Sequence, residues 1–183
     1  MKLISEFNKS LSLLFNAHGI TNLEFVEGED FCYYTSLHTV QWGLLTVEKT
    51  DNNFRQFFHE YGARGIDNTF VISLLHEVGH YMTIHYFDQI DLENDTAAKD
   101  NRLSDGTIDT NYWYWELPIE IAANMWAINW MNEHPAETQE LYELCAEYFE
   151  KIVSDEDILE QIADWQAAVE SGEYEPLYIY EED

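Results

Sequence analysis

Residues 67–87 read DNTFVISLLHEVGHYMTIHYF, and most of what the sequence predicts starts from this segment. Apolar side chains recur in it every three or four residues, which predicts one long helix over 70–87 with an N-terminal cap at residues 67–69. On a helical wheel the apolar residues fall on one arc, while His76 and His80 fall on the opposite arc. We therefore expect one side of this helix to face the core and the other to carry both histidines.

His76, Glu77 and His80 form an H-E-x-x-H pattern within this expected helix. Residues four apart lie one helical turn apart on the same side, so both imidazoles can reach a single metal ion. Glu77 is rotated about 100° from His76 and can reach a water molecule beside that ion as a general base. The pattern predicts a catalytic site with one Zn²⁺ per chain, His76 and His80 as ligands, and Glu77 as a catalytic residue.

A catalytic zinc ion takes three protein ligands, so a third must come from elsewhere in the chain. The best candidate is Glu120, within LPIEIAANMWA at residues 117–127. A helix that begins near Pro118 places Glu120 and Asn124 on one face, with small alanines between them that let a second helix approach. Asn124 could then accept a hydrogen bond from the second nitrogen of a ligand histidine. In the alternative interpretation, Glu120 only stabilises the helix N-terminus through the helix dipole.

HEVGH at residues 76–80, followed by E-x-x-A-N-x-W-A at 120–127, resembles the ImmA/IrrE-like metallopeptidases. More broadly, it resembles the gluzincins, the zincins in which a downstream helical glutamate completes the site. The similarity covers residues 67–131. It implies a zinc peptidase that hydrolyses a peptide bond in a regulatory protein such as a DNA-binding repressor.

A second resemblance involves GTIDTNY at residues 106–112, which is similar to the GTxDxxY segment of the deuterolysin-like aspzincins. That resemblance implies Asp109 as an alternative third metal ligand. It also implies that Tyr112 helps to stabilise the oxyanion, and Tyr112 is a candidate electrophile in either scheme.

The remaining patterns predict an α+β fold: a mostly helical, zincin-like domain with a small antiparallel sheet beside the H-E-x-x-H helix and a C-terminal helical pair. The sheet is expected within residues 23–47, which are rich in aromatic and β-branched residues. Residues 88–111 have no apolar periodicity. We assign residues 1–132 to the metallopeptidase domain and 133–183 to an acidic helical extension packed on it. Helices are further expected over 3–15, 50–62, 118–132, 141–152 and 158–169.

The charge balance is strongly acidic, with 36 acidic and eight basic residues and a formal net charge of −28. Such a field repels nucleic acids and anionic membranes, so we expect neither as a direct partner. We expect a protein or peptide substrate, and a basic protein suits this charge. The alternative function is an acidic binding protein, a nucleic-acid mimic or sequestering module, whose metal site is structural or vestigial.

The two cysteines, Cys32 and Cys145, are too few for a disulfide framework, and we expect both to be free and reduced. The N-terminal residues lack the unbroken apolar core of a secretion signal. No segment approaches the roughly 18 to 20 apolar residues that span a bilayer. The sequence therefore predicts a soluble, cytoplasmic protein.

Overall fold

The computed structural model describes residues 2–28, 31–43, 58, 62, 68–88 and 117–153. Within these ranges four α-helices, a short 3₁₀ helix and three strands follow one another along the chain. The fold is therefore α+β and mostly helical, as predicted. The elements are α1 Lys2–Ala17, β1 Glu24–Glu27, β2 Cys32–Tyr34, β3 Thr39–Trp42, α3 Thr69–Thr83, η2 Ile84–Tyr86, α5 Pro118–Glu133 and α6 Pro135–Val153.

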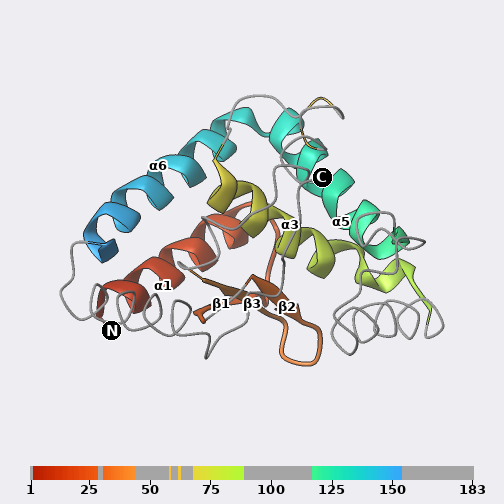
Figure 1. Ribbon diagram of the computed structural model, residues 1–183, viewed down its shortest axis with the longest axis horizontal. Helices are drawn as coiled ribbons and strands as arrows, with labels where there is room; N and C mark the ends of the chain where they lie inside the picture. Colours follow the sequence, from red (N-terminus) through yellow and green to blue (C-terminus); the bar gives the residue numbers. More distant parts are fainter. Residues whose placement is uncertain are drawn as a thin grey trace, which may run out of the picture.

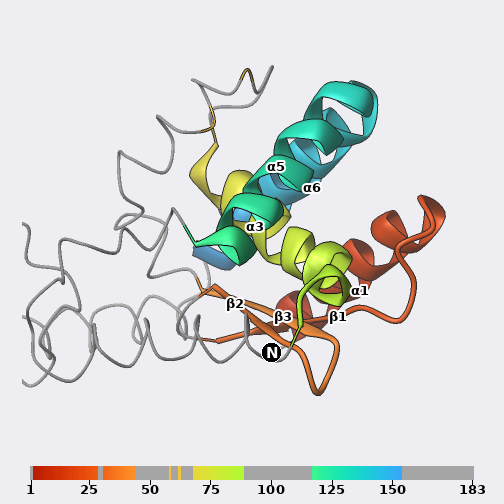
Figure 2. The same cartoon turned by 90° about the vertical axis from the view of Figure 1, so that its right-hand side faces the viewer.

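Helix α3 lies at the centre of the described structure. Figures 1 and 2 show the sheet on one side of α1 and α3, and α5 and α6 on the other side. α1 packs on β1, α3 packs on β2 and β3, and both α5 and α6 contact α3 from the far side. As a result every residue from Phe70 to His80 is buried. The apolar arc of this helix faces the core as predicted, and the opposite arc is covered as well.

The small sheet is mixed, which corrects the prediction of a purely antiparallel one. Its strand order is β1-β3-β2, with β2 antiparallel and β1 parallel to β3. A tight turn joins β2 to β3, with His38 at a φ of 50°, and such turns produce antiparallel pairs. β1 takes the other edge of β3, where α1 packs on it. Alternating hydrophobicity indicates which face a residue occupies, but not the direction of the partner strand.

Helix termini follow the capping signals in the sequence. The Asn68 side chain accepts a hydrogen bond of 3.1 Å from the backbone N–H of Val71 and caps α3. α1 ends at Ala17, and Gly19 follows with a φ of +81°, a conformation that favours glycine. α5 begins at Pro118, where proline's missing N–H costs nothing. These observations confirm the predicted starts of α3 and α5.

α3 is shorter than the predicted helix over 70–87. It ends at Thr83 and continues as the 3₁₀ helix η2. The Thr83 hydroxyl donates a hydrogen bond of 2.8 Å to the carbonyl of Gly79. A hydroxyl that bonds a carbonyl four residues back loosens the regular helical pattern, because it competes with a backbone N–H for that oxygen. The apolar periodicity extends beyond this point, which is why the pattern alone predicted a longer helix.

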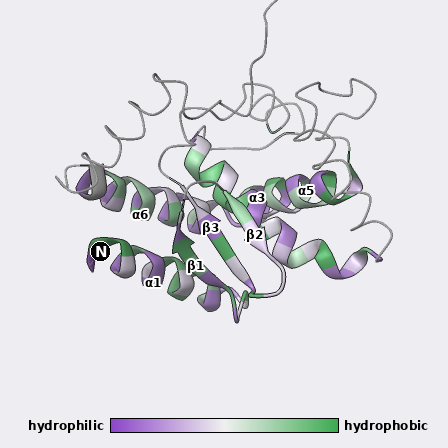
Figure 3. Cartoon of the chain, turned by 60° about the horizontal axis from the view of Figure 1, so that its bottom comes forward, coloured by the Kyte–Doolittle hydropathy of each residue, from purple (hydrophilic) through white to green (hydrophobic). Residues whose placement is uncertain are grey.

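An aromatic cluster holds α1, β3 and α3 together. The rings of Phe7 and Trp42 meet edge to face with centroids 5.1 Å apart, and Trp42 meets Phe70 at 5.6 Å. Trp42 is fully buried, and its indole N–H donates a hydrogen bond of 2.7 Å to Asn8 Oδ1. Figure 3 shows apolar and polar residues interspersed along α1 and α6, and both helices have exposed as well as buried residues. Among the described residues, the buried apolar side chains of the sheet and the helices form one cluster.

α3 and α5 approach so closely that only glycine fits at one contact. A Cβ atom built at Gly79 would lie 2.4 Å from the carbonyl oxygen of Ala123 and 2.9 Å from its Cα. Both contacts are shorter than van der Waals separation and involve backbone atoms, which cannot rotate away. The small residues expected to permit a close approach of two helices therefore do so, with Gly79 as the partner of Ala123.

Gly79→Ala is expected to destabilise the protein by about 1–3 kcal/mol, because the added methyl group forces α5 away from α3. In a solvent-exposed helix interior the same change would stabilise the protein by up to about 1 kcal/mol. A loss of stability therefore indicates that Gly79 contacts α5 closely. Urea unfolding measures it. The exposed α1 substitution Ser5→Ala serves as control and is expected to stay within about 0.5 kcal/mol of the wild type. Wild-type stability in Gly79→Ala would contradict the close contact.

Neither cysteine forms a disulfide bond, as predicted, and burial raises the pKa of the Cys145 thiol. None of the described helices is both long enough and apolar enough to cross a membrane. Several predicted segments lie outside the described residues: the helix over 158–169, most of that over 50–62, and the polar segment after residue 88.

Candidate metal centre

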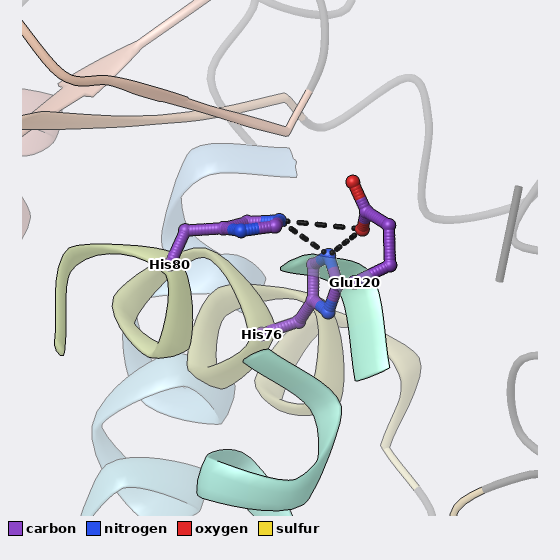
Figure 4. Close-up of side chains that lie close together, drawn as sticks. All are labelled: His76, His80 and Glu120. Carbon is purple, nitrogen blue, oxygen red and sulfur yellow. Dashed lines mark hydrogen bonds and ion pairs between the residues drawn. The ribbon is translucent and has the colours of Figure 1, made fainter. Parts of the chain in front are cut away.

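Two helices bring His76, His80 and Glu120 together. The histidines project from one side of α3, one turn apart, and Glu120 comes from the first turn of α5. Figure 4 shows the tips of the three side chains converging on one another. All three are buried, with exposed fractions of 4%, 7% and 0% in the order given. This buried group could hold a metal ion.

The mutual distances within the group match those between ligands of one ion. Glu120 Oε2 lies 3.0 Å from His76 Nε2 and 3.3 Å from His80 Nε2. The two Nε2 atoms are 3.1 Å apart. Ligand atoms held about 2.0–2.1 Å from a tetrahedral zinc ion lie about 3.3 Å from one another. Two imidazole nitrogens and one carboxylate oxygen form a donor set that zinc accepts, and a tetrahedral ion would keep a fourth position for water or substrate.

Asn124 orients the His76 ring through the nitrogen that does not face Glu120 and His80. His76 Nδ1–H donates a hydrogen bond of 2.7 Å to Asn124 Oδ1, and both residues are buried. This is the hydrogen bond that the spacing of Glu120 and Asn124 on one helical face predicted. It places the proton on Nδ1 and leaves Nε2 directed at Glu120 and His80, which is the arrangement that metal-binding histidines commonly need.

Interactions within the group shift the pKa values of His76 and Glu120 toward their charged forms, in spite of burial. Burial lowers the pKa of His76, but the hydrogen bond to Glu120 and the charges of Glu77 and Glu120 outweigh burial, so that this pKa is raised. Burial raises the pKa of Glu120, yet the charge of His80 and the hydrogen bonds with both histidines hold it well below its ordinary value. The Glu120 side chain is therefore a carboxylate, the form that binds metal ions.

Glu77 lies beside the group without being part of it. Its Oε1 is 4.0 Å from His76 Nε2, and its side chain is largely buried. This position follows from the helical wheel, which rotates Glu77 away from the line joining the two histidines. A carboxylate at this distance can take a proton from a water molecule held between it and the three other side chains.

The described structure does not test the two remaining candidates. Asp109, the alternative third ligand, and Tyr112, the candidate electrophile, both lie outside the described residues. The helix-dipole interpretation of Glu120 is compatible with its position in the first turn of α5. It does not account for full burial of the carboxylate against two imidazoles.

Sequence reasoning missed the part that Gly79 plays in this site. Its lack of a side chain lets α5 come close enough for Glu120 to reach both histidines. The available signal was the glycine itself. Glycine in a helix interior is about 1 kcal/mol less favourable than alanine, so its presence indicates that a neighbouring element leaves no room for a side chain.

Comparisons with protein-family models, with curated proteins and with solved structures found no match to this chain. We therefore infer the function from the geometry of four side chains, those of His76, Glu77, His80 and Glu120.

Proposed function

We propose that this protein is a zinc-dependent metallopeptidase. The observation that supports this most directly is the buried triangle of His76 Nε2, His80 Nε2 and Glu120 Oε2, with sides of 3.0–3.3 Å. One zinc ion per chain would be held by these three residues. The sequence resemblance to the ImmA/IrrE-like and gluzincin peptidases, in which a helical glutamate completes an H-E-x-x-H site, also supports this proposal.

When bound, zinc polarises a carbonyl group and makes water more acidic. The chain's own residues supply the rest of the chemistry. Glu77 takes a proton from the attacking water and later delivers it to the departing amine. Asn124 keeps the His76 ring in one orientation through its 2.7 Å hydrogen bond. Burial of the group excludes bulk water, which strengthens every electrostatic interaction within it.

The sheet offers a surface for an extended peptide. In the described part of the sheet β2 is an edge strand, and it packs on α3. Tyr33 of β2 meets Tyr81, the residue after His80, edge to face with centroids 5.8 Å apart. An extended substrate could pair with such an edge through backbone hydrogen bonds. The substrate in this proposal is a regulatory protein, such as a DNA-binding repressor, in the cytoplasm.

The test uses the 183-residue chain purified without chelator. Elemental analysis is expected to find about one zinc ion per chain. Incubation with a mixture of unstructured peptides, followed by mass spectrometry, is expected to reveal cleavage that stops with a chelator and returns with added zinc. Zinc-loaded protein that cleaves neither these peptides nor basic DNA-binding proteins would argue against a peptidase.

The net charge of −28 favours a second candidate, an acidic protein that sequesters a basic partner. In this case the metal ion would only stabilise the fold. Binding to the partner would weaken steeply as salt is added, and it would persist in Glu77→Gln, whereas hydrolysis would not.

A further inference from the structure

A pocket of about 350 Å³ opens where the ends of α1, α3 and α5 meet. In Figure 2 the last turns of these three helices lie on the same side of the molecule. We call it the tryptophan pocket. The residues that matter for its chemistry are His18, Met82, Trp126, Trp130, Glu133 and His134.

The tryptophan pocket is separate from the metal centre. None of the three candidate metal ligands lines it. On α5, Trp126 follows Glu120 by six residues, which corresponds to a rotation of about 240°. Trp126 and Trp130 therefore share a different face of α5 from Glu120 and Asn124. Whatever binds in this pocket need not touch the metal site.

Two stacked indoles make one wall of the pocket. The rings of Trp126 and Trp130, one helical turn apart, are 5.4 Å apart at their centroids and inclined by 25°. His18 and His134 pack edge to face against Trp130, with centroids at 5.7 Å and 4.3 Å. Trp130 is buried, so these contacts hold it in place. The pocket therefore presents a preformed aromatic wall.

The rim of the pocket is acidic. Glu133 lines it and is exposed, and Glu137 lies nearby, with its carboxylate 3.9 Å from His18 Nδ1. No lysine or arginine is among the described residues that line the pocket. The chain as a whole carries a formal charge of −28. An occupant with a positive charge would be attracted, and an anionic one would be repelled.

We infer that the tryptophan pocket binds an arginine side chain of a basic partner protein. A guanidinium group is planar and weakly hydrated, so it stacks on an indole face while its N–H groups donate to a carboxylate such as that of Glu133. Its methylene stem would pack on the indoles and Met82. Lysine lacks the planar group and is more strongly hydrated, so it would bind less well. This inference holds whether or not the metal centre hydrolyses peptides.

The test compares three peptides that differ at one position: acetyl-Gly-Arg-Gly-amide, its citrulline analogue and its lysine analogue. Citrulline has nearly the shape of arginine but no charge. Each is titrated into the ¹⁵N-labelled full chain, and NMR follows the six indole N–H signals. Trp126→Phe and Trp130→Phe identify two of these. The arginine peptide is expected to shift both signals saturably, with citrulline about tenfold weaker and lysine intermediate.

Variants separate this site from the metal centre. Glu133→Gln is expected to weaken binding of the arginine peptide about two- to fivefold, and Glu140→Gln, an exposed change that does not line the pocket, to leave it unchanged. Trp126→Ala should abolish the shift of the Trp130 signal. Glu77→Gln should bind the peptide like the wild type. Equal binding of the citrulline and arginine peptides, or no saturable shift of either indole signal, would overturn the inference.

Discussion

Glu77→Gln is expected to reduce peptide hydrolysis by about 10²–10⁴-fold while zinc remains bound. The amide has nearly the shape of the carboxylate but cannot accept a proton from water. Glu77 contributes no atom to the triangle formed by His76, His80 and Glu120, so its replacement leaves the three candidate ligand atoms in place. The rate of hydrolysis is measured under single-turnover conditions, with a peptide that the wild type cleaves. Elemental analysis of the same sample measures whether zinc remains bound.

The matched control for this variant is Glu140→Gln, the same chemical change at an exposed position on α6. It is expected to hydrolyse peptide at the wild-type rate. Full activity in Glu77→Gln would rule out Glu77 as the general base. Loss of zinc together with activity would instead indicate that Glu77 helps to hold the ion.

His76→Ala combined with His80→Ala is expected to abolish zinc binding, since it removes two of the three ligand atoms. Elemental analysis measures the loss directly. Thermal unfolding gives a second readout, because a ligand that binds only the folded state raises its stability. Added zinc should raise the Tm of the metal-free wild type and leave that of the double variant unchanged.

The double variant is also expected to lose stability for a reason other than zinc loss, and a matched variant measures that contribution. Glu120 is fully buried, and removing the partners of a buried charge costs about 3–5 kcal/mol. Adding Glu120→Gln to the double variant removes that charge and should restore part of the lost stability without restoring zinc. Stoichiometric zinc in either folded variant would mean that the ion binds elsewhere.

The close contact between α3 and α5 links the stability of the fold to the geometry of the site. Glu120 reaches both histidines only because Gly79 and Ala123 let the helices approach to backbone contact. A change that separates the helices would lengthen the distances of 3.0 Å and 3.3 Å on which the donor set depends. We therefore expect Gly79→Ala to weaken zinc binding in addition to lowering stability.

Local patterns were sufficient to predict where α3 and α5 begin and which side chains share a face of each helix. Asn68 and Pro118 mark helix starts through hydrogen bonding and a fixed φ, which are properties of a few adjacent residues. The four-residue spacing of His76 and His80, and of Glu120 and Asn124, places each pair on one helical face wherever that helix lies. The sequence by itself therefore determined the starts of α3 and α5, the candidate donor atoms and the acidic charge.

Only the tertiary structure decided how these parts meet. The pairing of β1 parallel to β3 depends on which edge of β3 remains open after β2 has folded back on it, and residue alternation contains no such information. The distances from Glu120 to the histidines depend on the separation of α3 and α5, which Gly79 sets. The tryptophan pocket needs the ends of three helices that are distant in sequence. Local propensities act over a few residues, whereas such contacts are set by packing of the whole core.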